Sequence, residues 1–277
     1  MQAGQTMWRP RAALCAALIL AGSLAYAQTA VQTGQFEPKV GQAGKDVVWV
    51  PTPQELVDKM LDMAKVTPQD FVIDLGSGDG RTVITAAKRG ARAKGIEYNP
   101  EMVALSQRNA TAQNLGDRAA FVQADLFETD LSPATVITMF LLPDINLKLR
   151  PKILDLKPGT RVVSNTFSME EWEADETYRI PDCPSWCTAL LWIVPAKVAG
   201  TWKTPQGELV LTQRFQNVTG TLQSGSAGAP VSITGKLNGE EIAFSGGGVE
   251  YTGRVNGNTM SGTARPGGSW TATRAGR

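Results

Sequence analysis

The chain of 277 residues contains no histidine. Histidine is the usual general base of serine and cysteine hydrolases and the commonest metal ligand in proteins. Its absence therefore excludes Ser-His-Asp and Cys-His hydrolases, together with metal sites that are ligated by histidine. Reactions that mainly require the placement of an already activated group remain compatible with this composition.

The chain also lacks an excess of charge of either sign. Its 27 lysines and arginines face 26 aspartates and glutamates. Arg9 and Arg11 lie in an N-terminal segment without acids, so the remainder of the chain has 25 bases against the same 26 acids. This balance provides no electrostatic attraction for a phosphate backbone, and no nucleic-acid partner is expected.

The N-terminus has the pattern of a secretory signal. Arg9 and Arg11 precede an apolar stretch without charge at residues 12–24, and Ala25-Tyr26-Ala27 forms an A-x-A cleavage site. An uncleaved anchor would need a longer apolar run, and a mitochondrial leader would contain more arginine. We therefore expect residues 1–27 to be a signal peptide cleaved after Ala27. The mature protein is then periplasmic and has no stable membrane span.

Cysteine is scarce. Cys15 lies inside the apolar stretch of the leader, so Cys183 and Cys187 are the only pair in the mature chain. In an oxidising compartment they are expected to form a disulfide that closes a small loop. A metal site would need further ligands, and none cluster here, so no bound metal is expected.

The chain does have a glycine-rich loop between a predicted strand and a predicted helix. Residues 71–75 are apolar apart from Asp74, Gly76-Ser77-Gly78-Asp79-Gly80 follows, and a helical pattern starts at Arg81. Strand, glycine turn and helix build small-molecule sites in open α/β sheets. The spacing fits neither G-x-G-x-x-G nor the P-loop. Asp74 and Asp79 would repel a pyrophosphate but attract a ligand with an ammonium and a sulfonium, such as S-adenosylmethionine.

Two further predicted strands also end in acids. Glu97 ends the strand that follows the glycine loop, where an acid is expected to hold ribose hydroxyls. Asp125 ends the next strand. Three such acids in order are more specific than a glycine motif alone. The alternative is a generic α/β protein whose strands happen to end in acids.

Residues 48–175 resemble the class I S-adenosylmethionine-dependent methyltransferases. More narrowly, four segments resemble the group that contains the mitochondrial lysine methyltransferases of ATP synthase and of the adenine nucleotide translocase. These segments are Val50-Pro51-Thr52-Pro53, Asp74-Leu75-Gly76-Ser77-Gly78-Asp79-Gly80-Arg81, Phe140-Leu141-Leu142-Pro143 and Asn146-Leu147-Lys148-Leu149-Arg150-Pro151. The resemblance covers under half of the chain, and its motifs specify the cofactor more closely than the substrate.

The resemblance implies that S-adenosylmethionine lies across the carboxyl ends of the first four strands. Its methionine portion is expected at Asp74 and the glycine loop, its ribose at Glu97, and its adenine at Asp125. The expected cofactor contacts are Asp74, Gly76, Ser77, Gly78, Glu97, Tyr98, Asp125 and Leu126.

The resemblance also places the methyl acceptor at the end of the fourth strand, at Leu142 and Pro143. There, backbone carbonyls can orient an amine, although the proline fits a simple turn equally well. Asn165, after the fifth strand, is expected over the same rim. Trp172 either walls a substrate channel or is a partly buried surface residue. No side-chain base is evident, so water or the Leu142 carbonyl is left to receive the proton of the amine.

The expected fold is α/β. Residues 28–47 are a linker, and residues 48–197 form a Rossmann-like methyltransferase domain with a seven-stranded sheet and helices on both faces. Residues 198–277 form a small antiparallel β domain. There Thr234-Gly235-Lys236-Leu237-Asn238-Gly239 recurs as Thr252-Gly253-Arg254-Val255-Asn256-Gly257, and Asn-Gly between alternating segments is a strong hairpin signal. Six or seven short strands closed into a small barrel or sandwich are expected.

The sequence thus predicts an S-adenosylmethionine-dependent methyltransferase that N-methylates a protein lysine or a similar amine. The alternative is an exported binding protein that keeps the cofactor fold and uses its β domain to hold an envelope partner. The leader favours the alternative, because the cofactor is made in the cytoplasm. The intact strand-end acids favour the enzyme.

Overall fold

The computed structural model describes residues 1–4, 36–225 and 228–276, and it divides into two units, Met1–Gln35 and Phe36–Arg277. The predicted cleavage site after Ala27 and Cys15 lie outside the described residues. No helix within the described parts has both the length and the apolar character that crossing a bilayer requires. All helices and strands among the described residues lie in the second unit.

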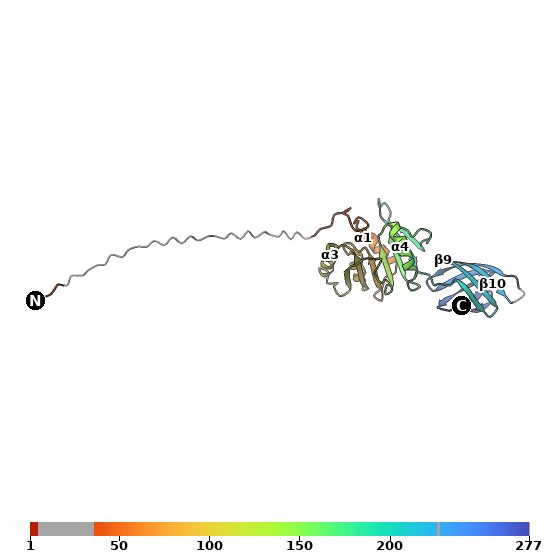
Figure 1. The fold of residues 1–277 in the computed structure, drawn as a ribbon. Helices are drawn as coiled ribbons and strands as arrows, with labels where there is room; N and C mark the ends of the chain where they lie inside the picture. The colour runs from red at the N-terminus through yellow and green to blue at the C-terminus, as the bar shows by residue number, and fades with distance from the viewer. Residues whose placement is uncertain (5–35, 226–227, 277) are drawn as a thin grey trace. The chain divides into compact units, whose positions relative to one another are not determined.

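The first part of this unit is a seven-stranded sheet in the order β3-β2-β1-β4-β5-β7-β6. In Figure 1 it is the part of the ribbon that carries the labels α1, α3 and α4. Neighbours among β1 to β5 run parallel, whereas β7 is antiparallel to both β5 and β6. The strands are β1 Phe71–Leu75, β2 Arg92–Glu97, β3 Ala119–Gln123, β4 Val136–Met139, β5 Arg161–Asn165, β6 Glu176–Arg179 and β7 Thr188–Ile193. The predicted seven-stranded methyltransferase sheet is confirmed.

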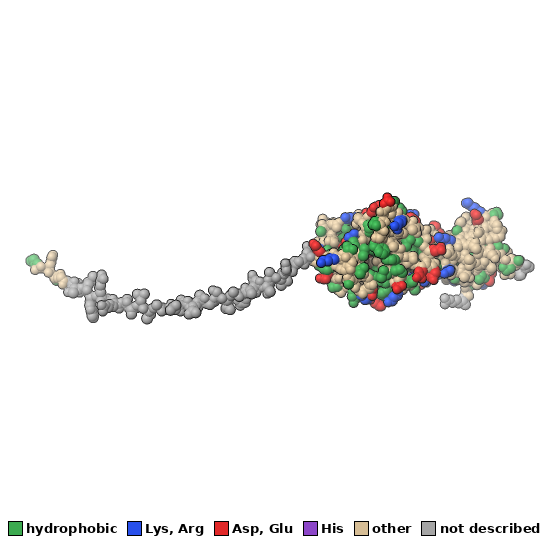
Figure 2. Space-filling view, turned by 90° about the horizontal axis from the view of Figure 1, so that it is seen from above, with side chains coloured by type: hydrophobic (Ala, Val, Ile, Leu, Met, Phe, Trp, Pro, Cys, Tyr) green, Lys and Arg blue, Asp and Glu red, His purple; other side chains and the backbone are tan. Residues whose placement is uncertain are grey.

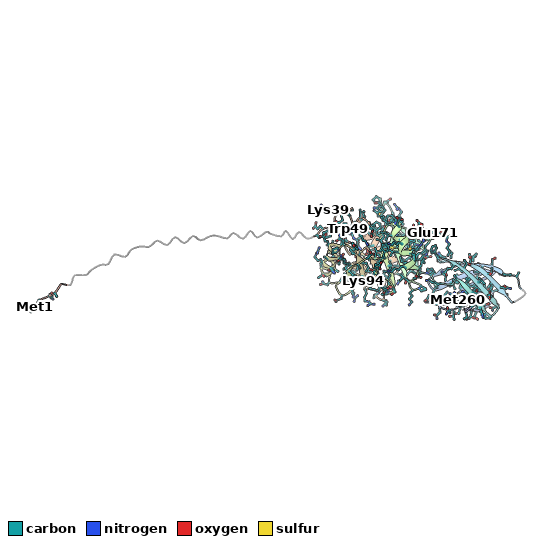
Figure 3. The ribbon with its side chains drawn as sticks, in the orientation of Figure 1. Met1, Lys39, Trp49, Lys94, Glu171 and Met260 are labelled. Atoms are coloured by element: carbon teal, nitrogen blue, oxygen red, sulfur yellow. A yellow bond between two sulfur atoms is a disulfide. The ribbon has the colours of Figure 1, made fainter. Side chains whose placement is uncertain are left out.

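Helices cover both faces of the sheet because its central strands are apolar on both sides. Val72 and Ile73 are adjacent in β1 and point to opposite faces, where each joins a separate hydrophobic cluster. The first cluster packs under α1 Gln54–Met63, α2 Arg81–Lys88 and α3 Pro100–Thr111, and the second packs under α4 Pro143–Leu154. In Figure 3, Lys94 marks β2, and Trp49 marks the segment that precedes α1.

The second part is a closed antiparallel barrel in the order β10-β11-β12-β13-β14-β15-β8-β9. Eight strands form it, so the expected number of six or seven was too low. They are β8 Gly200–Thr204, β9 Gly207–Arg214, β10 Asn217–Ser224, β11 Val231–Asn238, β12 Glu241–Gly246, β13 Val249–Asn256, β14 Thr259–Arg265 and β15 Gly268–Arg274. Alternate side chains fill the interior, including Trp202, Phe244 and Trp270.

The predicted hairpins are present, with their turns one residue later than Asn-Gly. Asn238 pairs with Glu241 across the β11–β12 hairpin, so Gly239 and Glu240 form the turn. Gly239 has a φ of 61°, which is the conformation that a II′ turn requires at its first central residue. The asparagine therefore ends the strand, and the glycine begins the turn.

The sheet and the barrel also touch. Phe215, between β9 and β10, stacks on Trp172 with ring centroids 6.0 Å apart, and Trp172 has no exposed surface. The Gln216 side chain donates a hydrogen bond of 2.8 Å to the Glu173 carbonyl. Trp172 is therefore part of the core between Trp192 and Phe215, and the idea that it walls a substrate channel was wrong.

Candidate active site

A cavity of about 410 Å³ opens at the carboxyl edge of the sheet, which is where open α/β sheets bind ligands. The ends of β1, β2 and β4 line it, together with residues 42–52, here called the N-terminal strap. Hydrophobic side chains gather on the face seen in Figure 2. The large apolar residues of the cavity lining that are exposed are Val48, Tyr98, Leu142 and Trp186.

The glycine loop shapes the floor of this cavity. Gly76 and Gly78 have φ values of 75° and 55°, which side chains rarely tolerate. A Cβ atom on Gly78 would lie 2.7 Å from the indole nitrogen of Trp49. Glycine is therefore required at position 78 both for its backbone conformation and for the close approach of Trp49.

Asp74 is a buried carboxylate at the end of β1. Its Oδ1 accepts a hydrogen bond of 2.6 Å from the Thr138 hydroxyl, and no lysine or arginine within the described residues forms an ion pair with it. Burial, together with the nearby carboxylates of Glu97 and Asp79, raises the pKa of Asp74 to about 7. A buried acid that lacks a cationic partner fits a ligand that carries an ammonium.

Glu97 ties the end of β2 to the glycine loop. Its Oε2 accepts the Gly78 N–H at 3.0 Å, and its Oε1 accepts the Asn99 N–H at 2.9 Å. Asn99 in turn caps α3 through the N–H of Glu101. Glu97, Tyr98 and Ser77 all line the cavity. The carboxylate is held in place by two N–H groups and keeps further lone pairs for a ligand.

Asp125 and Leu126 lie on the lining at the β3 side of the cavity. Lys45 forms an ion pair of 2.6 Å with Asp125 and lies 4.6 Å above the centre of the Tyr98 ring. The hydrogen bond from Lys45 lowers the pKa of Asp125. Lys45 belongs to the segment expected to be a linker, and residues 42–48 were missed as site residues. The apolar run Val47-Val48-Trp49-Val50 is the sequence feature that indicates packing of this segment against the domain.

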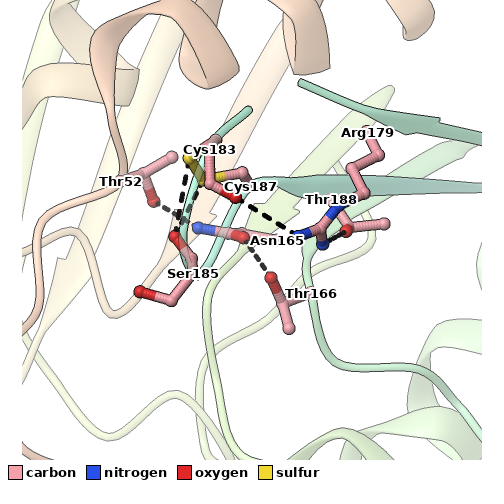
Figure 4. Close-up of a disulfide and its surroundings, with 8 residues drawn as sticks. All are labelled: Thr52, Asn165, Thr166, Arg179, Cys183, Ser185, Cys187 and Thr188. Carbon is pink, nitrogen blue, oxygen red and sulfur yellow. Dashed lines mark hydrogen bonds between the residues drawn. A yellow bond between two sulfur atoms is a disulfide. The ribbon is translucent and has the colours of Figure 1, made fainter. Parts of the chain in front are cut away.

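The end of the cavity near Leu142, where the sequence predicts the methyl acceptor, is here called the acceptor end, and it differs in part from the sequence-based expectation. Leu142 lines the cavity, whereas Pro143 is the first residue of α4 and is not in the lining. Asn165 is fully buried, donates to the Thr52 hydroxyl at 3.3 Å and accepts from the Thr166 hydroxyl at 2.8 Å (Figure 4). These bonds turn Asn165 into the protein, so the structure does not bring it to the rim.

Three aromatic residues line this end: Phe140 from one of the four resembling segments, Phe167 two residues after Asn165, and Trp186, which no motif identified. Trp186 comes from the loop between β6 and β7, where Cys183 and Cys187 form the expected disulfide. The Arg179 guanidinium donates a hydrogen bond of 3.2 Å to the Cys183 carbonyl (Figure 4). No local sequence signal connects these three rings.

The residues present fit S-adenosylmethionine. A buried acid lies at the first strand end, glycines with positive φ allow close backbone approach, and a second acid follows one strand later. The volume of about 410 Å³ lies within the range of small-molecule sites. The contacts assigned to individual portions of the cofactor remain predictions from the sequence.

Comparisons with known proteins agree with this fit. A family model described as the ANTKMT methyltransferase domain matches residues 74–176. A protein-lysine N-methyltransferase of Saccharolobus islandicus is 43% identical over 151 residues, which cover 53% of this chain and 94% of that protein. The adenine nucleotide translocase lysine N-methyltransferase of Mus musculus is 34% identical over 119 residues, 42% of this chain and 52% of the relative.

A solved structure is also similar. The RNA methyltransferase from Salinibacter ruber in complex with S-adenosyl-L-homocysteine has 45% sequence identity and a TM-score of 0.51, and the match covers 54% of this chain and 96% of that one. The chain spans about half the length of the animal relatives that it matches. The match covers nearly the whole of the Saccharolobus protein, however. This chain is an S-adenosylmethionine-dependent methyltransferase and belongs to the family that carries the ANTKMT methyltransferase domain.

Proposed function

We propose that this enzyme transfers a methyl group to a lysine amine of a protein. The 43% identity to nearly the whole of a protein-lysine N-methyltransferase is the observation that carries the proposal. S-adenosylmethionine supplies a methyl group that is already activated by its sulfonium. In this proposal Asp74 and the glycine loop bind and orient the cofactor, Glu97 holds its ribose, and the apolar end of the cavity receives the acceptor.

The acceptor amine has to lose a proton before it can attack, because lysine has a pKa of about 10.4 in water. The Leu142 carbonyl is poorly placed to take this proton, since it already accepts the N–H groups of Ile145 and Asn146 at 3.0 and 3.1 Å. The lining residues around it are apolar. Removal from water lowers the pKa of an amine, so in this proposal the amine gives its proton to solvent water as it enters the apolar end and attacks as the neutral nucleophile, with S-adenosylhomocysteine as the leaving group.

Transfer to RNA is a second candidate, because the similar Salinibacter ruber structure is described as an RNA methyltransferase. The charge balance of the chain does not favour RNA binding. After residues 1–27 the chain has 25 bases and 26 acids, whereas nucleic-acid binding depends on an excess of lysine and arginine. We therefore favour the protein acceptor and use RNA as the competing outcome of the test.

We further propose that the mature enzyme acts in the periplasm. The signal-like residues 1–27 support export, and the disulfide between Cys183 and Cys187 is of the kind that persists in oxidising compartments. The comparisons give no support to the alternative of an exported binding protein without enzymatic function. This proposal requires that S-adenosylmethionine reaches the periplasm.

The test is incubation of the purified enzyme and methyl-labelled S-adenosylmethionine with an envelope protein fraction, a soluble protein fraction and total RNA. Label is expected in protein, and mass spectrometry is expected to locate one to three added methyl groups on lysine. Asp74→Ala should abolish labelling. The exposed Asp117→Ala is the matched control and should retain it. Label found in RNA, or only on residues other than lysine, would overturn the proposal.

A further inference from the structure

Three aromatic rings from separate segments meet at the acceptor end of the cavity. Phe140 follows β4, Phe167 follows β5, and Trp186 precedes β7. Their ring centroids are 5.9 Å apart for Phe140 and Phe167, 6.0 Å for Phe140 and Trp186, and 5.5 Å for Phe167 and Trp186. Rings at these distances are in direct contact. They form one continuous surface, here called the aromatic wall.

Trp186 is the unusual member of the aromatic wall. It is 41% exposed, so burial in the core does not account for its position. Its φ of 60° is a conformation that residues other than glycine keep only where the surroundings impose it. The disulfide closes the loop around it, and Cys187 at one end of the loop is fully buried. The loop therefore holds a large apolar ring at the mouth of the cavity.

The chemistry of the lining divides the cavity into two parts. The charged lining residues come from the N-terminal strap, from the β1, β2 and β3 ends and from the start of α2, and they are Lys45, Asp46, Asp74, Asp79, Arg81, Glu97 and Asp125. The lining residues that follow β4, lie in α4, follow β5 or belong to the disulfide loop are apolar: Phe140, Leu141, Leu142, Ile145, Phe167 and Trp186. The second part therefore suits an apolar chain that ends in a neutral group.

We propose that Trp186 is a specificity-determining residue that, with Phe140 and Phe167, binds the four-methylene stem of the acceptor lysine. This inference rests on the proposed function. The rings pack along the stem and exclude water from the amine, which loses its proton more readily out of water. The disulfide between Cys183 and Cys187 is the positioning element, because it fixes the short loop that carries Trp186.

The first test measures binding of n-butylamine, which reproduces the lysine side chain, to the complex of the enzyme with S-adenosylhomocysteine. Trp186→Ala should weaken this binding at least about fivefold, because it removes one of three contacting rings. Trp186→Phe should restore most of the affinity. The affinity of the double variant Cys183→Ser/Cys187→Ser should lie between those of Trp186→Ala and Trp186→Phe. Ethylamine, with a shorter stem, should discriminate little between the variants. Each variant is first shown to bind S-adenosylhomocysteine, which establishes that it is folded.

The second test is steady-state methylation of the lysine substrate identified by labelling. Trp186→Ala should raise KM more than it lowers kcat and should move the pH profile of the reaction to higher pH, since water then reaches the amine. Val210→Ala, an exposed apolar position in the barrel, is the control. If the folded Trp186→Ala enzyme binds n-butylamine with unchanged affinity and has an unchanged KM, the inference about Trp186 is wrong. The proposed lysine methylation would not be affected by that result. Label in RNA would remove the proposed function and this inference together.

Discussion

At the scale of single residues, the position of Asp74 in the fold determines the pKa of its carboxyl group. It ends a strand that is buried on both faces, so its carboxylate lies in a poorly solvated place with the Thr138 hydroxyl as its partner. Burial raises its pKa to about 7, which lies near physiological pH. In the proposed site the ammonium of the cofactor favours the charged form of Asp74, so cofactor binding is expected to be coupled to the loss of a proton.

This coupling predicts that affinity for S-adenosylmethionine depends on pH. Without cofactor Asp74 is increasingly protonated below about pH 7, so affinity should fall as pH drops, by up to about tenfold per pH unit. Calorimetry between pH 5 and 6.5 measures the effect and stays below the range in which the α-amino group of the cofactor loses its charge, since α-amino groups have pKa values of about 7.7–8.0. Asp74→Asn should bind more weakly and show a flat profile. A pH-independent affinity of the native enzyme would contradict the assignment.

Glu97 supports a second prediction. Glu97→Ala should weaken cofactor binding by about 1–3 kcal/mol, because a charge-assisted hydrogen bond to the ribose is lost and the Gly78 N–H loses its acceptor. Titration calorimetry checks this, with the exposed Glu101→Ala of α3 as the matched control. Unchanged affinity in Glu97→Ala would remove the ribose assignment.

At the scale of elements, the hairpin of β6 and β7 carries the disulfide loop. β7 runs antiparallel to β5, so its first residues lie at the edge where β4 and β5 end. This topology is why residues that follow β6 reach the cavity. The loop thereby adds a wall to a cavity whose charged part is built mainly by the ends of the parallel strands and by the N-terminal strap.

The disulfide gives the third prediction. A chain that begins after residue 27 and is purified from an oxidising compartment should show no free thiol in non-reducing denaturant, because Cys183 and Cys187 are then paired. A thiol titration reagent gives the measurement, and two reactive thiols per chain would contradict the pairing. The same assay after reduction is the control and should give two.

At the scale of the whole molecule, the barrel packs on the methyltransferase part. Phe215 stacks on the fully buried Trp172, and the Arg150 guanidinium lies 5.3 Å from the centre of the Phe215 ring. The Ala196 N–H also bonds to the Gly239 carbonyl at 2.8 Å. The barrel therefore covers apolar surface of the larger domain, although none of its described residues lines the cavity.

These contacts give the fourth prediction. A chain that ends at Lys197 should still bind S-adenosylmethionine, because the described residues that line the cavity all precede it. Its melting temperature should fall by a few degrees, since a loss of 1 kcal/mol lowers Tm by about 2–4 °C in a domain of this size. Calorimetry and thermal unfolding give the two measurements, and Phe215→Ala in the full chain should reproduce part of the loss. A folded shortened chain without cofactor binding would show that the barrel completes the site.

The sequence by itself determined the features that are local. The glycine loop, the acids at successive strand ends and the hairpins of the barrel all depend on dihedral preferences and positions within a few residues. Seven strands and their helices followed from the same local patterns together with the family resemblance. Even so, the turns at Gly239 and Gly257 begin one residue later than Asn-Gly indicates, since pairing register decides which residues form the turn.

Only the tertiary structure decided which distant residues meet. The aromatic wall joins positions 140, 167 and 186, and residues 42–48 fold over a cavity from a segment that resembles a linker. Asn165 was expected over the rim, and Trp172 was expected either in a channel wall or partly buried at the surface. Both are fully buried, because the packing of neighbouring elements determines the direction in which a side chain points. The direction of a side chain cannot be predicted from composition and motif spacing. It is fixed when strands pair and helices close over the sheet.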